Sequence, residues 1–96
     1  MQHKTTLHKL SCGMPLLICA NHEVELATVD IWVRTGSGHE PPAVNGISHF
    51  LEHMLFKGTA QYGLGEIENR IESLGGVCNA ATSLDFTHYY VTIPSS

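Results

Sequence analysis

The sequence GISHFLEHMLFKG, residues 46–58, predicts a single helix that carries two imidazoles and a carboxylate. Because a helix turns roughly 100° per residue, His49 and His53 lie on one face, and Glu52 points to the same side. Apolar residues surround this helix almost completely, which predicts that the helix is buried. These residues are Ile47, Phe50, Leu51, Met54, Leu55 and Phe56.

The spacing of the three polar residues suits a catalytic zinc site. Zinc readily takes neutral imidazole nitrogen, and a catalytic site keeps three protein ligands and one open position for water. A carboxylate that lies beside this water without binding the metal can accept its proton and so activate the water for attack on a carbonyl. The prediction is that His49 and His53 bind Zn²⁺ and that Glu52 is the base. The alternative is a pair of core histidines bonded to backbone groups, with Glu52 in solvent.

Two blocks of the sequence carry a resemblance to a known family. Residues 46–59, GISHFLEHMLFKGT, resemble the inverted zinc-binding segment of the pitrilysin, insulin-degrading enzyme and mitochondrial processing peptidase family of zinc metallopeptidases, the inverzincins. Residues 75–83, GGVCNAATS, together with Asp85, Thr87 and Tyr89, are similar to the substrate-facing strand of that family. The resemblance implies a zinc metalloendopeptidase that hydrolyses peptide bonds of peptides or unfolded protein segments.

The same resemblance implies that the chain is only part of a peptidase. Family members are several times longer than these 96 residues, and their third zinc ligand is a Glu on a later helix, past Ser96. We expect residues 1–96 to form the N-terminal portion of a zinc metallopeptidase domain, without the rest of that domain or the second homologous domain. The isolated chain is then expected to be inactive, and its partners to be a peptide substrate and the remainder of the peptidase or a homologous partner subunit.

Turn signals and alternating apolar residues divide the chain into short elements. The predicted fold class is α+β: an antiparallel-rich sheet with helices packed on one face, forming an incomplete N-terminal portion of the larger family domain. For the helix at residues 46–58 we expect Asn45 as N-cap and Gly58 as C-cap. The predicted strands are residues 5–10, 14–20, 26–35, 77–83 and 87–93.

A second helix is predicted over residues 64–74. Leu64, Ile67, Ile71 and Leu74 repeat at helical spacing, which predicts an amphipathic helix that packs on the sheet. Glu66 and Arg70 are expected to pair on its exposed face, and Gly75 to end it.

The predicted strand at residues 77–83 is rich in small side chains, which allow another backbone to approach closely. An extended peptide can add to such a sheet edge, and the Asn79 amide can contact a peptide carbonyl. The resemblance implies a substrate-binding role for Asn79, Ala80 and Ala81, and for Phe56 as part of a pocket beside the cleaved bond. The alternative is an edge or bulged strand with weak packing.

The loop at residues 36–42 carries glycines and charged residues that we assign no chemistry. Gly36-x-Gly38 lacks the third glycine and the immediate helix of a dinucleotide-binding fingerprint. Arg34 and Glu40 are expected to form a salt bridge across this loop rather than to contact substrate. His3, His8 and His22 have no ligand spacing between them, and we expect them to lie in solvent at strand ends and turns. His88 is expected to point to the opposite face of its strand and not to bind the metal.

Composition excludes several classes of partner. A net charge of −4 without a basic cluster argues against nucleic acid and against an anionic membrane. No apolar run approaches the roughly 18 residues that span a bilayer. Three cysteines without a Cys-x-x-Cys pair indicate reduced thiols. We therefore expect a bacterial-type cytoplasmic protein without nucleic-acid or membrane partners.

Two alternatives to a single-chain peptidase are compatible with this sequence. The chain could belong to a non-catalytic peptide-binding or assembly subunit that keeps the same fold without turnover. It could also be a truncated chain that a partner polypeptide completes. Stoichiometric zinc that depends on His53 favours the enzyme.

Overall fold

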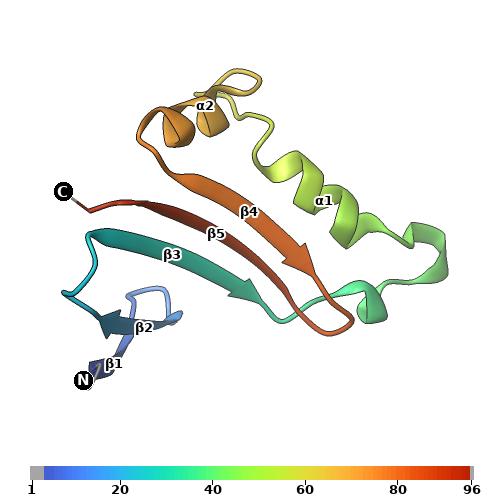
Figure 1. The fold of residues 1–96 in the computed structure, drawn as a ribbon. Coiled ribbons are helices and arrows are strands. Elements are labelled where there is room, and N and C mark those ends of the chain that lie inside the picture. The colour runs from blue at the N-terminus through green and yellow to red at the C-terminus, as the bar shows by residue number, and fades with distance from the viewer. Residues whose placement is uncertain (1–3, 96) are drawn as a thin grey trace.

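The computed structural model describes residues 4–95 and forms an α+β fold (Figure 1). His3 lies outside the described residues. The strands are β1 (Lys4–Lys9), β2 (Pro15–Ala20), β3 (Leu26–Val33), β4 (Val77–Thr82) and β5 (Thr87–Pro94). The helices are α1 (Ile47–Leu55) and α2 (Glu66–Ser73), with the short 3₁₀ turns η1 (Ser37–His39) and η2 (Pro42–Val44) between β3 and α1. None of the helices in the described part is long and apolar enough to cross a membrane.

The first two strands form the predicted hairpin. β1 and β2 are antiparallel, with Lys4 opposite Ala20 and Lys9 opposite Pro15. Gly13 has a φ of 92° in the turn between them, a conformation that glycine adopts without strain. This two-stranded sheet is separate from the main sheet and is drawn below β3 in Figure 1.

The main sheet has the strand order β3-β5-β4, and all of its pairs are antiparallel. The amide of Ser83 donates to the carbonyl of Phe86 at 2.9 Å, which closes a tight turn between β4 and β5. β4 therefore lies at one edge of this sheet, as predicted for the small-residue strand.

Both helices pack on one face of β4 (Figure 1). Alternate β4 residues, Cys78, Ala80 and Thr82, are half-buried, whereas Asn79 and Ala81 on the other face are exposed. Because Cys78 lies on the face of β4 that α2 covers, burial and then the α2 carboxylates of Glu68 and Glu72 raise the pKa of its thiol. The prediction of helices on one face of an antiparallel sheet is confirmed.

The prediction that the first helix is buried is wrong for the described residues. Phe50 is 65% exposed and Leu51 is 52% exposed, and no apolar side chain in residues 4–95 is fully buried. The physical reason is the small amount of structure beside α1, because its main neighbours in this part of the chain are β4 and η1. Within residues 4–95, no layer covers the apolar surface of α1.

The predicted bounds and caps of α1 also need correction. The helix begins at Ile47, and its N-cap is Gly46, with a left-handed φ of 92°, rather than Asn45. It ends at Leu55 with Phe56 as C-cap, so Gly58 lies beyond the helix. The N-cap carries no side-chain oxygen, and the carboxylate that caps this helix comes from Glu40 instead.

α2 confirms the main features of the second predicted helix. The Glu66 and Arg70 side chains pair at 3.4 Å, and Gly75, with a φ of 81°, follows the end of the helix. The helix is shorter than predicted, because Gly65 is its N-cap. Leu64 lies outside it and is 86% exposed, so its expected place on the packed face was wrong.

Candidate metal and catalytic site

The α1 helix brings His49 and His53 together as their spacing predicts. Their Nε2 atoms lie 2.9 Å apart, and the ring centroids are separated by 4.4 Å. Two nitrogens bound at about 2.05 Å to a tetrahedral ion lie about 3.3 Å apart, so only a small ring movement separates this pair from zinc geometry. The donor set therefore fits two of the ligands of a zinc site.

Glu52 projects from the same helix toward β4. Its Oε2 accepts a hydrogen bond of 2.6 Å from the Thr82 hydroxyl, and both residues are half-buried. The bond to Thr82 places Glu52 above the helix-bearing face of the sheet, which Tyr89 on β5 shares. Burial and then the Glu52 carboxylate raise the pKa of the Tyr89 phenol. The alternative in which Glu52 is simply solvated does not describe this carboxylate.

A third metal ligand is not found in the described part of the chain. Within residues 4–95, no three His, Cys, Asp or Glu side chains gather closely enough to hold a metal ion. Glu66 is paired with Arg70, and Asp85 lies in the β4–β5 turn beside Ser83. The described residues supply two imidazoles and a nearby carboxylate.

Glu40 anchors the start of α1, a role that the sequence did not indicate. Its two carboxylate oxygens accept hydrogen bonds of 2.7 Å each from the amides of Gly46 and Ser48. Those amides are unpaired donors at a helix N-terminus, where a negative charge is favoured. The expected salt bridge between Arg34 and Glu40 is therefore wrong, because the Glu40 carboxylate is used as a cap.

Hydrogen bonds from Gly46, and then from the Ser48 hydroxyl and amide, hold the pKa of the Glu40 carboxyl below its ordinary value. A carboxyl whose pKa is lowered by folding stabilises the protein above its unfolded pKa, and this stabilisation is lost as pH falls through the folded pKa. We predict that Glu40→Gln lowers the melting temperature at pH 7 by roughly a few degrees, because the amide cannot accept both bonds. The difference from the parent protein should close as the pH falls below the lowered pKa of Glu40. The loop variant Glu23→Gln is the control, and an equal loss in both variants would contradict the capping role.

The loop at residues 36–40 is fixed against the β4–β5 turn. The amides of Ser37 and Gly38 donate to the carbonyls of Ser83 and Leu84 at 2.9 and 2.7 Å. A Cβ atom at Gly36 would lie 2.2 Å from the Ser83 oxygen, so only glycine permits this approach. The glycines thus allow the loop at residues 36–38 to pack closely on the backbone of the β4–β5 turn. This loop leads directly to Glu40 and α1.

The open edge of β4 presents the backbone of alternate residues. The Ser83 amide donates to the Phe86 carbonyl and so points toward β5. Backbone groups of successive residues point in opposite directions along an antiparallel strand. The amide and carbonyl groups of Thr82, Ala80 and Cys78 therefore point toward the open edge. The Asn79 side-chain oxygen accepts from the Ala80 amide at 2.8 Å, in agreement with this direction. Ala81 lies on the exposed face of the sheet, and Phe56 is half-buried at the end of α1.

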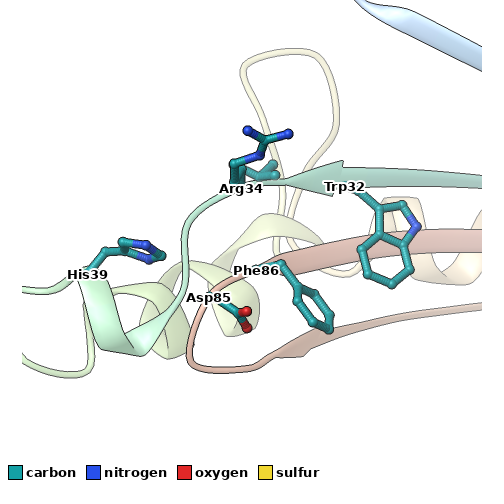
Figure 2. A pocket seen from close by; sticks show the side chains of 6 residues that line it. Trp32, Arg34, His39, Asp85 and Phe86 are labelled. Atoms are coloured by element: carbon teal, nitrogen blue, oxygen red, sulfur yellow. The ribbon is translucent and has the colours of Figure 1, made fainter.

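A separate hollow of about 580 Å³ lies at the end of β3 (Figure 2). Its lining includes Trp32, Arg34, His39, Asp85 and Phe86. The Arg34 guanidinium and the Asp85 carboxylate point away from each other in Figure 2, so the charged groups do not converge on one point. We assign no chemistry to this hollow.

His88 lies on the sheet face opposite the helices and takes no part in the His49–His53 pair. Its Nδ1 lies 3.0 Å from an Asp30 oxygen, and its ring stacks on the Trp32 ring with the ring centroids 4.2 Å apart. His88 is thus held between neighbouring strands. His8 and His22 are exposed, as expected.

The sequence matches one family and is similar to several known proteins. Residues 16–96 match the sequence profile of the family described as insulinase (peptidase family M16). An uncharacterized zinc protease of Bacillus subtilis, YmxG, is 43% identical over 81 residues, which are 84% of this chain and 20% of that protein. The beta subunit of the mitochondrial processing peptidase of Blastocladiella emersonii is 41% identical over 90 residues, 94% of this chain and 19% of that protein.

The fold has a solved counterpart. The crystal structure of a protease from Helicobacter pylori superimposes with a TM-score of 0.88 at 31% identity, and the match covers 98% of this chain and 22% of that chain. The chain thus spans about a fifth of the length of the proteins it matches.

The family match and the His-x-x-Glu-His sequence on α1 place this chain in the class of metallopeptidases with an inverted zinc motif. Within that class, the chain belongs to the insulinase family, peptidase family M16.

Proposed function

We propose that this chain is the N-terminal portion of a zinc metalloendopeptidase that hydrolyses peptide bonds in peptides or unfolded protein segments. The observation that carries the proposal is the His49–His53 pair, with Nε2 atoms 2.9 Å apart, on the same helix as the half-buried Glu52. The family membership of the chain supports the same function.

In this proposal, His49 and His53 hold the metal through Nε2, and Glu52 is the general base. A bound zinc ion would lower the pKa of its water to near neutrality and polarise the carbonyl under attack. Glu52 accepts the proton of the attacking water and can return it to the leaving amine. The Thr82 hydroxyl donates to Oε2, and Oε1 remains available to accept this proton.

The substrate is proposed to add as a strand to the open edge of β4. The outward backbone groups of Ala80 and Thr82 can bond to an extended peptide, and the Asn79 amide can contact a peptide carbonyl. Asn79 bonds to the Ala80 amide in the structure, so it would exchange this contact for the peptide. Ala81 and Phe56 complete the proposed substrate-binding set.

The remaining parts of the active site are proposed to lie in the rest of the peptidase or in a partner subunit. The two imidazoles found among residues 4–95 leave a catalytic zinc site one protein ligand short, and α1 exposes apolar side chains such as Phe50. One similar protein is named as a subunit, which supports assembly with a second chain. The isolated 96 residues are therefore proposed to be inactive.

The proposal is tested by metal removal from the complete protein that carries this chain. Its cleavage of a quenched fluorescent peptide should fall to background after dialysis against a chelator and return when stoichiometric zinc is added, because zinc activates the water. The isolated chain should show no cleavage under either condition. Cleavage that survives complete zinc removal would overturn the metallopeptidase proposal. A complete protein that binds zinc but never cleaves would favour the non-catalytic peptide-binding subunit.

A further inference from the structure

We propose that Thr82 is a positioning residue that fixes the Glu52 carboxylate for catalysis and couples it to the strand on which the peptide is aligned. This inference rests on the proposed function. It assigns a separate task to the hydroxyl of a residue that neither binds the metal nor accepts the proton.

The first argument is the direct contact between β4 and α1. The Thr82 Oγ1 donates to Glu52 Oε2 at 2.6 Å, across 30 positions of sequence, and both residues are half-buried. A hydrogen bond to an ionised acceptor is roughly twice as strong as one between neutral groups. A glutamate side chain on an exposed helix samples many rotamers, and this bond selects one of them.

The second argument is the position of Thr82 at the end of β4. Its side chain points to the helix-bearing face, whereas its amide and carbonyl face the open edge. The same residue therefore contacts Glu52 through its hydroxyl and can contact an added peptide strand through its backbone. A peptide aligned on β4 is thereby placed at a fixed distance from the base.

The third argument is that the surrounding backbone holds this contact in place. The β4–β5 turn that follows Thr82 is bonded to the loop at residues 36–38, and this loop leads to Glu40, which caps α1. α1 is thus attached to the end of the sheet at two points, its N-terminus and Glu52. Loss of the Thr82 hydroxyl leaves the helix capped but frees the Glu52 carboxylate.

The consequence for catalysis is a selective loss of turnover. Partners that orient catalytic or ligating groups typically contribute about 10–100-fold to activity when they are removed. In Thr82→Val, which has the shape of threonine without the hydroxyl, we expect kcat to fall by about that factor. KM and zinc content should stay within about twofold of the parent values, because the valine keeps the strand backbone and touches neither histidine.

The experiment uses the complete zinc-loaded protein and compares three further variants with Thr82→Val. Thr82→Ser keeps a hydroxyl and should restore kcat to within about threefold of the parent value. Thr82→Ala removes the hydroxyl without adding a branched side chain, and gives the same comparison if the valine variant does not fold. Thr28→Val is the matched control, because Thr28 bonds to Thr92 at 2.8 Å on the other sheet face, so its kcat should not change.

Several results would overturn the inference. An unchanged kcat in both hydroxyl-free variants, a rise in KM alone, or a loss of kcat that Thr82→Ser does not restore would each show that Thr82 does not position the base. An equal loss in Thr28→Val would show a general effect on the sheet. The parallel variant Glu52→Gln separates this inference from the function beneath it. If Glu52→Gln is inactive and Thr82→Val is fully active, only the role of Thr82 fails, whereas an active Glu52→Gln removes the proposed function itself.

Discussion

Glu52→Gln is expected to reduce peptide cleavage by the complete protein by a factor of about 10² to 10⁴ and to leave zinc binding intact. The substituted side chain keeps an amide oxygen that can accept the Thr82 hydroxyl, so the contact between α1 and β4 survives the change. An amide cannot accept a proton from water. The loss should therefore appear in kcat and persist at saturating substrate. Cleavage is measured with a quenched fluorescent peptide, and the metal content of the same preparation is measured beside it.

A matched control for this variant is Glu72→Gln on α2. Glu72 is an exposed helical acid next to Cys78, on the same side of the sheet as α1 but outside the proposed active site. Its replacement changes net charge by the same amount and should leave kcat unchanged. If Glu52→Gln retains cleavage with its zinc in place, Glu52 is not the base. If Glu52→Gln loses its zinc, the carboxylate holds the metal and does not merely lie beside it.

The local part of the site is predictable from sequence because helical spacing alone determines it. His49 and His53 are four residues apart, so any helix through them places both rings on one face, and the structure shows this pair in contact. The bond between Glu52 and Thr82 joins residues 30 positions apart, and a spacing rule within one element cannot predict it. Alternation along β4 could have placed Thr82 on the same face as Ala80, but not opposite Glu52.

The cap of α1 shows a second limit of local rules. Asn45 is a residue type that often caps helices, and the sequence therefore favoured it. The chain instead turns through Gly46 in a left-handed conformation, and Glu40 reaches back to the two free amides. Such a cap depends on the path of the loop at residues 36–40, which docks on the distant β4–β5 turn.

The strands were predicted with small errors at their ends, because alternation and turn residues are local signals. The strand expected over residues 26–35 ends at Val33, and the small-residue strand ends at Thr82. The prediction of burial for α1 failed for a different reason. Apolar residues such as Phe50 and Leu51 show that a helix has a surface that must be covered. They do not show which segment of the protein covers it.

His53→Ala is expected to lower the zinc content of the complete protein from about one ion per chain to near none, because it removes one of the few ligands of the site. The two Nε2 atoms lie 2.9 Å apart and both histidines are exposed within residues 4–95, so the alanine variant removes no packed side chain from this part of the chain. The folded protein should therefore remain, and cleavage should be lost together with the metal. His22→Ala, a change at an exposed histidine before β3, is the control and should keep both zinc and activity.

The melting temperature with and without added zinc distinguishes a lost ligand from a damaged fold. A ligand that binds only the folded state stabilises it by about 2.7 kcal/mol at a free concentration of about 100 times its dissociation constant. The parent protein and His22→Ala should both gain this increment when zinc is added to the metal-free form. His53→Ala should melt near the metal-free parent and gain little or nothing, since a site that has lost one of its three protein ligands binds zinc weakly. A full zinc increment in His53→Ala would place the metal elsewhere and would remove the basis for a catalytic role of α1.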